Sequence, residues 1–368
     1  MKRQPRSSPP STKPRRTVSI IGTGSYVPEK VLTNDDLSRI VDTNDEWITT
    51  RTGIKERRIA AKDEFTSDMA AKAALKAIEQ AKIKPIEIDL ILVATATPDM
   101  VFPATACFVQ TKIGATKAAC LDVSAACAGF LFALEIAQQF ITSHTYETVL
   151  VIGAEKLTSI TNWTDRNTCV LFGDGAGAAI LRHRGDGTHG VISTHIGSDG
   201  RYADILFMPG GGCKTPITRE NADKHLQTIH MSGKEVYKQA VIAMMNASKK
   251  ALEQAGLTID DISCVIPHQA NVRIIEAIAD RFKIPIEKFY VNLDRYGNTS
   301  AAAVAIALDE ANRTGRIKAG DYILMVVFGG GLTWASTVIE WDSARGHRSL
   351  SCRAKSRHLL LLLSRHKQ

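Results

Sequence analysis

One cysteine of this chain occupies a position from which a thiol can act as a nucleophile. Cys127 follows a strand-like segment, 121–123, and small residues, and it precedes a helical pattern that runs to about Ile141. A thiol at a helix N-terminus faces the positive end of the helix dipole, which favours the thiolate. The cysteines at 107, 120, 169 and 264 lie in apolar stretches and are typical of structural thiols.

Two further polar residues have comparable surroundings. His268 lies just past a buried strand, in the kind of loop that carries chemistry in α/β folds, and Asn298 comes just before another helix. A lone His or a lone Asn is usually structural, but three such residues at strand–helix junctions favour a shared site. The sequence therefore predicts a Cys127, His268 and Asn298 catalytic site.

Predicted strands and helices alternate along the chain, and they must position these three residues. Apolar runs predict strands at 18–21, 90–94, 149–152, 262–266 and 323–327. Helical patterns cover 66–82, 128–142, 233–255, 271–281 and 300–312. This alternation predicts an α/β fold.

The chain also contains an internal duplication. KAIEQA at 76–81 recurs as KALEQA at 250–255, and the same offset of 174 superimposes two pairs of predicted strands. We therefore expect two similar halves, 17–185 and 186–342, with an irregular excursion near 199–230. The offset places Ala301 opposite Cys127, so packing with pseudo-twofold symmetry would bring Asn298 to the cysteine.

The net charge of +8 belongs to the two ends of the chain. Residues 1–16 hold six Lys or Arg and 343–368 hold seven, with no acidic residue in either segment, so 17–342 has 33 basic and 38 acidic residues. We expect a disordered basic tail at 1–16 and a second tail outside the fold at 343–368. An acidic body argues against nucleic acid as a partner.

The sequence also argues against a membrane-spanning protein, a metal-binding protein and a disulfide-bonded protein. No apolar run approaches the length of a membrane span, and the five leucines at 359–363 are too few. The seven cysteines form no CxxC pair and no cluster with histidines, so neither a metal site nor a disulfide framework is expected. We expect a reducing, cytoplasmic location.

Eight ordered motifs resemble the thiolase-fold condensing enzymes, most closely the β-ketoacyl-acyl-carrier-protein synthase III family. The resemblance covers 17–342. It implies a thiolase-like layered αβαβα fold, built from two similar halves. The motifs are 22–26, 45–47, 50–54, 126–130, 172–178, 267–271, 297–301 and 328–331.

The resemblance implies the initiating reaction of type II fatty-acid synthesis. Cys127 would take an acyl group, expected to be acetyl, from acyl-CoA, and malonyl-acyl-carrier protein would then lose CO₂ and attack it. His268 and Asn298 would stabilise the enolate. The backbone N–H groups of Cys127 and Gly330 would hold the acyl oxyanion.

Neighbouring subfamilies differ at identifiable positions. Elongating synthases have a second His where this chain has Asn298, and thiolases have a second cysteine near the glycine run 329–331, which has none here. A related condensing enzyme of secondary metabolism, with another primer or acceptor, remains the alternative.

The resemblance also implies how acyl-CoA binds, as a substrate and not as a cofactor. Trp47 and Arg166 would hold the adenine between them, while Arg51 and Thr52 would contact the phosphates, with Asn271 as a further contact. Asn167 stands where the family has glycine, so the loop after Arg166 differs. Phe102 would close the primer pocket of a partner subunit, which implies a homodimer and a short primer.

A local basic surface would receive the acidic carrier protein. It resembles the family's docking patch. Asp280 stands where a further basic residue is expected, which would weaken docking. The expected contacts are Gln269, Ala270, Asn271, Val272, Arg273, Lys238 and Arg281.

Overall fold

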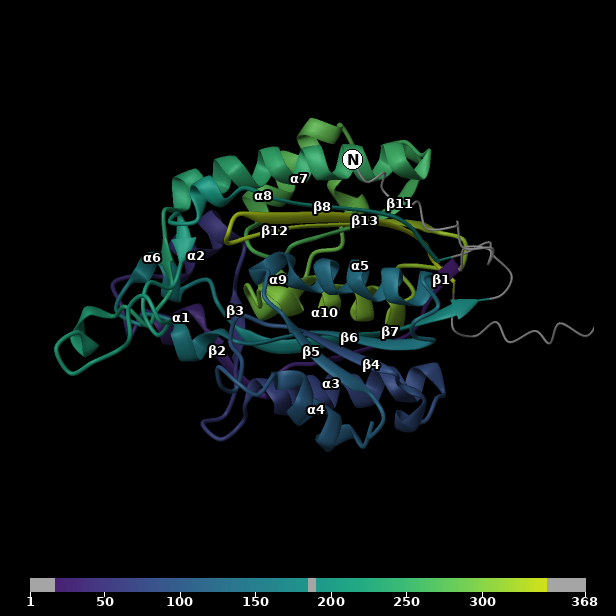
Figure 1. The fold of residues 1–368 in the computed structure, drawn as a ribbon. Coiled ribbons are helices and arrows are strands. Elements are labelled where there is room, and N and C mark those ends of the chain that lie inside the picture. The colour runs from purple at the N-terminus through teal and green to yellow at the C-terminus, as the bar shows by residue number, and fades with distance from the viewer. Residues whose placement is uncertain (1–16, 185–189, 343–368) are drawn as a thin grey trace, which may run out of the picture.

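The computed structural model describes residues 17–184 and 190–342. The expected tails 1–16 and 343–368, including the leucines at 359–363, lie outside the described residues, as do 185–189 at the expected boundary between the halves. Two sheets alternate with three layers of helices (Figure 1). This confirms the predicted αβαβα fold.

The first sheet takes its five strands from residues before 185. Strands β4, β5 and β6 are parallel, and β7 pairs antiparallel with both β6 and β1. Helices α3 (Thr66–Ala81) and α4 (Thr105–Ile113) cover its outer face (Figure 1). The strands, in spatial order, are β1 (Thr17–Tyr26), β7 (Asp174–Arg184), β6 (Thr148–Lys156), β4 (Leu90–Ala94) and β5 (Ala119–Val123).

The second sheet repeats this pattern. Its order, β11–β12–β13–β8, corresponds to β4–β6–β7–β1 of the first sheet. Strand β6 begins at Thr148 and β12 at Tyr322, which is the offset of 174 found in the sequence. Helices α7 (Gly233–Ala255) and α8 (Val272–Phe282) cover its outer face (Figure 1). The strands are β11 (Ile262–Pro267), β12 (Tyr322–Gly329), β13 (Thr333–Glu340) and β8 (Gly190–Ser198).

Two helices fill the space between the sheets. These are α5 (Gly129–Thr142) and α10 (Ala301–Arg313). A side chain at Gly177 of β7 would put its Cβ 2.5 Å from the Cβ of Ala305, so the missing side chain lets α10 pack directly on the first sheet. A Cβ at Gly129 would lie 3.7 Å from that of Ala301. The first residues of α5 and α10 therefore lie side by side.

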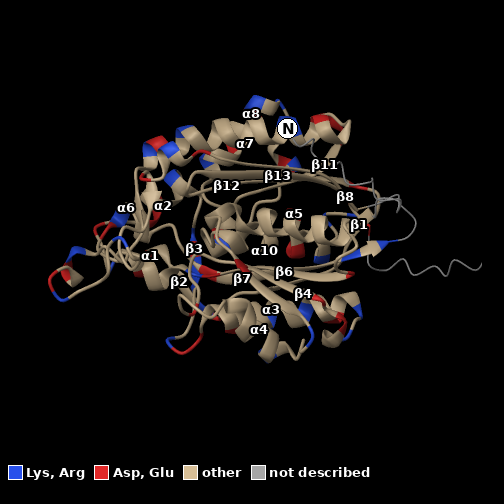
Figure 2. Ribbon diagram, viewed as in Figure 1, with Lys and Arg blue, Asp and Glu red and all other residues tan. Residues whose placement is uncertain are grey.

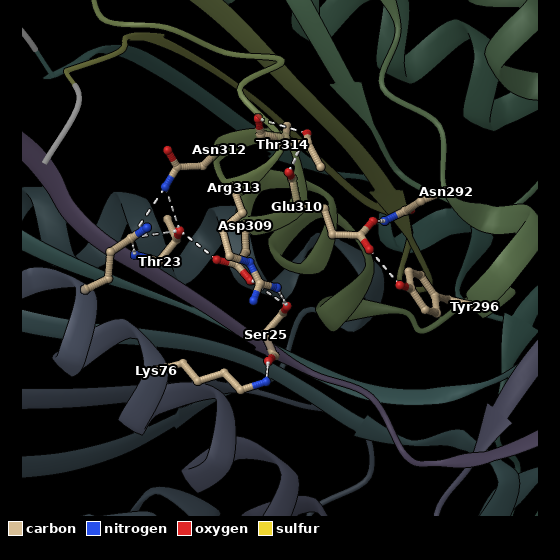
Figure 3. Close-up of polar contacts among 12 residues, drawn as sticks. Thr23, Ser25, Lys76, Asn292, Tyr296, Asp309, Glu310, Asn312, Arg313 and Thr314 are labelled. Atoms are coloured by element: carbon tan, nitrogen blue, oxygen red, sulfur yellow. Dashed lines mark hydrogen bonds and ion pairs between the residues drawn. The ribbon is translucent and has the colours of Figure 1, made fainter. Parts of the chain in front are cut away.

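Polar contacts fix α10 against the first half (Figure 3). The buried carboxylate of Asp309 accepts hydrogen bonds from Thr23 Oγ1 at 2.8 Å and Ser25 Oγ at 2.5 Å, both on β1. Arg313 pairs with the same carboxylate at 2.6 Å. A buried carboxylate without partners is costly. Moving α10 would separate Asp309 from these partners, so the contacts fix the position of the helix.

Shorter elements surround one end of the layered body. The expected irregular excursion near 199–230 is confirmed, because its regular structure is limited to short 3-10 turns, one two-residue strand and the first residue of another. No described helix has the length and apolar character needed to cross a bilayer. The short elements are β2 (Lys30–Thr33), β3 (Glu56–Ile59), β9 (Leu206–Phe207), β10 (His230–Met231), α1 (Asn34–Leu37), α2 (Asp45–Thr52), α6 (Arg166–Cys169) and α9 (Leu293–Tyr296).

Candidate active site

Cys127 lies in a strained turn between β5 and α5. It belongs to a 3-10 turn, Ala126–Ala128, that continues directly into the helix. The preceding residue, Ala126, has φ +44°, a left-handed conformation that is costly for any residue except glycine. The side chain of Cys127 is buried, with 8% of its surface exposed. The strand–turn–helix placement expected from the sequence is therefore present.

His268 and Asn298 are held by backbone contacts between the halves and within the second sheet. His268 N–H donates to the carbonyl of Val326 at 2.8 Å, so His268 extends the pairing of β11 with β12. Asn298 N–H donates to the carbonyl of Leu171 at 2.8 Å, a residue of the first half. Ser300 N–H donates to Asn298 Oδ1 at 2.8 Å, which leaves the amide NH₂ of Asn298 as a donor for a ligand.

The three side chains line one cavity of about 780 Å³. Gly330, at the end of β12, lines it as well. Thr333 Oγ1 lies 2.9 Å from the carbonyl oxygen of Ala125 and 3.1 Å from that of Gly330, so it ties the glycine run to the segment before Cys127. The fold thus brings Cys127, His268, Asn298 and Gly330 to one space.

Two opposing effects act on the ionisation of the Cys127 thiol, burial and the helix dipole. Burial raises the pKa of this thiol from the usual 9.0 to about 12. That change corresponds to about 4 kcal/mol against the thiolate. A helix N-terminus stabilises a nearby negative charge by at most about 2 kcal/mol. Burial therefore opposes the thiolate that the helix N-terminus favours, and a protonated Cys127 must lose its proton when it reacts.

His268 is a neutral imidazole at physiological pH. Burial lowers its pKa from the usual 6.5 to about 4. Its Nδ1 atom is buried and has no hydrogen-bond partner among residues 17–184 and 190–342. The ring can therefore donate one hydrogen bond in the cavity without carrying a charge.

Trp47 and Arg51 line the cavity, and Arg166 lies against the Trp47 ring. The guanidinium carbon of Arg51 lies 4.6 Å from the Trp47 ring centroid, and that of Arg166 lies 5.1 Å from it. A base stacked between Trp47 and Arg166 needs about 7 Å, two carbon–carbon contacts. Arg166 must therefore swing outward to admit an adenine. Its Nη1 atom donates to the backbone carbonyl of Asp42 at 2.8 Å and lies 3.2 Å from the exposed carboxylate of the same residue, a weak surface pair.

Two further side chains that were expected to contact CoA, Thr52 and Asn271, already form hydrogen bonds within the protein. Thr52 lines the cavity, but its hydroxyl donates to Ile48 O at 2.8 Å and accepts from Ile54 N–H at 3.0 Å. Asn167, which replaces the expected glycine, also lines the cavity. Asn271 caps α8, because its Oδ1 accepts from Arg273 N–H at 2.9 Å.

The expected carrier-protein contacts divide into two groups. Ala270, Asn271 and Arg273 line the cavity mouth. Lys238, on α7, is exposed. Figure 2 shows basic residues on both α7 and α8. Exposed Arg281 lies eight residues beyond Arg273 on α8, about 12 Å along the helix axis.

Two of the expected contacts face the protein interior. Gln269 is 1% exposed, and its amide donates to Pro267 O and Tyr290 O and accepts from Asn292 N–H. The side chain of Gln269 therefore braces the loop behind His268 from inside the protein. Val272 packs partly buried against the core.

Phe102 does not line the cavity of its own chain. Its side chain is 82% exposed and adjoins Val101, which is 89% exposed. An exposed apolar pair of this kind is unusual on a monomer surface unless another molecule covers it.

Several cavity residues were missed by the sequence analysis. Leu206, Phe207, Met208 and Ile229 of the irregular excursion form one wall together with Met231, which directly follows it. Their irregular backbone carries no periodic signal. Ser300, in the motif 297–301, also lines the cavity. Within the described ranges, no group of three or more His, Cys, Asp and Glu side chains is placed to hold a metal ion.

Comparisons with known proteins agree on one family. Residues 121–200 match the model of 3-oxoacyl-[acyl-carrier-protein] synthase III, and residues 252–341 match its C-terminal model. The chain is 58% identical to the beta-ketoacyl-[acyl-carrier-protein] synthase III of Caldanaerobacter subterraneus over 88% of this chain and 97% of that protein. The Desulfitobacterium hafniense protein of the same name is 54% identical, over 90% and 99%.

A solved structure gives the same result. The crystal structure of 3-oxoacyl-[acyl-carrier-protein] synthase III from Aquifex aeolicus superimposes with a TM-score of 0.82 and 48% identity. The match covers 88% of this chain and 100% of that one.

Proposed function

The chain belongs to the β-ketoacyl-acyl-carrier-protein synthase III family and is an initiating condensing enzyme of fatty-acid synthesis, an acyltransferase; from this premise we propose that Cys127 carries the acyl group. The observation that carries the proposal is that Cys127, His268 and Asn298 line one cavity. The rival assignment to secondary metabolism is not favoured by relatives of this identity.

The first half-reaction is acyl transfer to Cys127. The sulfur attacks the thioester carbon of acyl-CoA, and the N–H groups of Cys127 and Gly330 stabilise the oxyanion. CoA leaves as a thiolate and takes a proton from water. Trp47 and Arg51 hold the nucleotide end at the mouth, where both line the cavity. Acyl-CoA is thus a substrate, and the proposal includes no resident cofactor.

The second half-reaction is decarboxylative condensation. Loss of CO₂ from malonyl-carrier protein places negative charge on its thioester oxygen. The neutral imidazole of His268 and the free amide NH₂ of Asn298 donate to that oxygen. The enolate carbon attacks the acyl carbon on Cys127, the C–S bond breaks, and a 3-oxoacyl-carrier protein leaves.

Assembly and primer are part of the proposal. The exposed Phe102 is available to close the pocket of a second copy, and β5 forms an edge of the first sheet. We therefore propose a homodimer that takes acetyl-CoA, because a bulky ring leaves space for a short primer. The cytoplasm, where acyl-CoA and reduced thiols coexist, is the proposed compartment.

Incubation with acetyl-CoA tests the proposal directly. We expect intact-mass measurement to show one acetyl group on the protein, and peptide mapping to place it on Cys127. Malonyl-carrier protein added afterwards should release the group as acetoacetyl-carrier protein. No adduct with any short acyl-CoA would contradict the proposed function.

Carrier-protein docking gives a separate prediction. Arg273→Glu reverses a charge at the cavity mouth, so the KM for malonyl-carrier protein should rise about tenfold, while kcat changes little. Steady-state kinetics at low and high salt measure the effect, which should shrink at high salt.

The matched control is Arg281→Glu, the same charge reversal on an exposed arginine of the same helix. Because Arg281 lies farther from the mouth, its effect on KM should be smaller. Equal effects of both variants would show that docking is not centred on the mouth.

A further inference from the structure

The carboxylate of Glu310 is connected to both donors of the second half-reaction. Glu310 lies on α10, and its side chain is 14% exposed. Its Oε2 atom accepts from the amide of Asn292 at 2.7 Å, and its Oε1 atom accepts from the hydroxyl of Tyr296 at 2.6 Å (Figure 3). These three residues have no role in the half-reactions described above.

Glu310 is held as a charged carboxylate. The guanidinium of Arg295 donates to both of its oxygens, at 3.0 and 3.1 Å. An arginine that donates to both oxygens fixes the plane of the carboxylate. Burial raises the pKa of Glu310, but the hydrogen bonds that it accepts outweigh burial, so the pKa lies below its usual value. At neutral pH the carboxylate therefore keeps all of these contacts.

The first branch of contacts leads from Glu310 to His268. Asn292, which is 2% exposed, donates its backbone N–H to Gln269 Oε1 at 3.0 Å. The amide of Gln269 in turn donates to the carbonyl oxygen of Pro267 at 2.8 Å. Since Pro267 and Gln269 flank His268 in the chain, a displacement of Asn292 is passed to the backbone that carries the imidazole.

The second branch leads from Glu310 to Asn298. Tyr296 is the last residue of α9, and Gly297 joins it to Asn298 with φ +64°, a left-handed conformation. A side chain at Gly297 would put its Cβ 2.7 Å from the carbonyl oxygen of Leu171, so the turn packs closely against the first half. Holding Tyr296 therefore sets the direction from which the chain enters Asn298.

The two donors are anchored on different parts of the fold. The backbone of His268 bonds to Val326 in the second sheet, whereas that of Asn298 bonds to Leu171 in the first half. Both side chains must reach one thioester oxygen, so their spacing matters to a fraction of an ångström. Glu310 bonds to a residue of each branch, so it ties the position of one donor to that of the other.

We propose that Glu310 is a positioning residue for decarboxylation, which sets the spacing between the imidazole of His268 and the amide of Asn298. This inference rests on the proposed function, because it assigns Glu310 to the second half-reaction. In this role Glu310 does not touch the substrate and exchanges no proton. Cys127 belongs to neither branch, so acyl transfer does not depend on Glu310.

The test measures the two half-reactions separately in E310A. Single-turnover acetylation of Cys127 by acetyl-CoA, followed by intact mass, should keep the wild-type rate. The kcat for CO₂ release from malonyl-carrier protein should fall about 10- to 100-fold, because a displacement of about 1 Å can cost a hundredfold in rate. The KM for malonyl-carrier protein should change little, since Arg273 at the mouth is untouched.

E310Q is the conservative variant. Its carbonyl oxygen can accept from Asn292, and its NH₂ group can donate to the Tyr296 hydroxyl, so both branches remain attached. It loses the ion pair with Arg295, whose side chain is 45% exposed, so the effect should be much smaller than that of E310A. Equal losses of CO₂ release in E310A and E310Q would show that the charge matters and the position does not, which would overturn the proposal.

The matched control is D309A, which removes the neighbouring carboxylate of α10. Asp309 is fully buried and bonds to Thr23 and Ser25 of β1, away from the partners of Glu310 (Figure 3). Losing these contacts should lower the stability of the fold but leave the ratio of the two half-reaction rates unchanged. A selective loss of CO₂ release in D309A would overturn the proposal, because any loosening of α10 would then have that effect.

The outcomes separate this inference from the proposed function. If the wild type neither acquires an acetyl group nor releases CO₂, the proposed function itself fails. If the wild type does both and E310A keeps its kcat for CO₂ release, or loses both half-reactions equally, only the positioning role is overturned. Should E310A not fold, N292A decides, because it removes the amide that reaches Glu310 and keeps the backbone N–H that bonds to Gln269. N292A should lose CO₂ release selectively, and wild-type rates of both half-reactions in it would overturn the role.

Discussion

Cys127→Ala should abolish acyl transfer and leave the decarboxylation of malonyl-carrier protein in place. The alanine keeps the backbone N–H and the small size of the site but has no nucleophile. The condensation rate should fall on the order of a millionfold, as it does when other covalent enzymes lose their nucleophile. Product formation from acetyl-CoA and malonyl-carrier protein, with intact mass for the adduct, measures the effect.

Two comparisons sharpen this result. Cys107→Ala removes another free thiol, on α4, and should remain active. CO₂ release by C127A should continue, since His268 and Asn298 remain and line the same cavity. An acyl adduct that persists in C127A would place the nucleophile elsewhere and would contradict the proposed site.

His268→Ala should have the opposite effect. Cys127 should still be acylated, because the oxyanion donors proposed for acyl transfer are backbone N–H groups and not the imidazole. Decarboxylation should fall about 100- to 1000-fold, the usual loss for one donor to an oxyanion. Asn298→Ala, which removes the other donor, should behave in the same way. Separate assays of the acetyl adduct and of CO₂ release distinguish the two half-reactions.

The pH dependence of CO₂ release provides an independent check. With a pKa of about 4, the His268 ring stays neutral down to acidic pH, so the rate should show no His268 titration between about pH 5 and pH 8. An ordinary histidine would titrate near 6.5 in that range. His195→Ala, a change at a partly buried histidine on β8, is the control. An inflection near pH 6.5 that only H268A removes would contradict a neutral donor.

The predicted elements agree with the structure where apolar character is continuous. The strand predicted at 90–94 is β4, and the helices predicted at 66–82 and 233–255 are α3 and α7. Strands β7 and β8 were not predicted. Their segments are rich in Gly, Ala, Ser, Thr and His, and they gain their β conformation from pairing with β1 and β13. Such non-local pairing leaves little trace in the local composition.

The candidate site was predictable in its residue types and less so in its surroundings. Cys127, His268 and Asn298 were found because each lies beside a strand or a helix start. The wall formed by Leu206–Phe207 and its neighbours was not found, since irregular segments carry no periodicity. The burial of the Gln269 side chain could not be predicted for a related reason: its amide bonds to Tyr290 O and Asn292 N–H, distant backbone groups that no local pattern reveals.

The sequence alone determined which chemical groups are present, which of them begin helices or end strands, and that the fold consists of two similar halves. These properties follow from local composition and from a repeat. Only the tertiary structure decided their electrostatic state. Cys127 is buried because the layers that pack around α5 exclude water from it, and this burial raises the pKa of its thiol. Burial and charge depend on neighbours from distant parts of the chain, so the folded arrangement sets the pKa values on which the reaction depends.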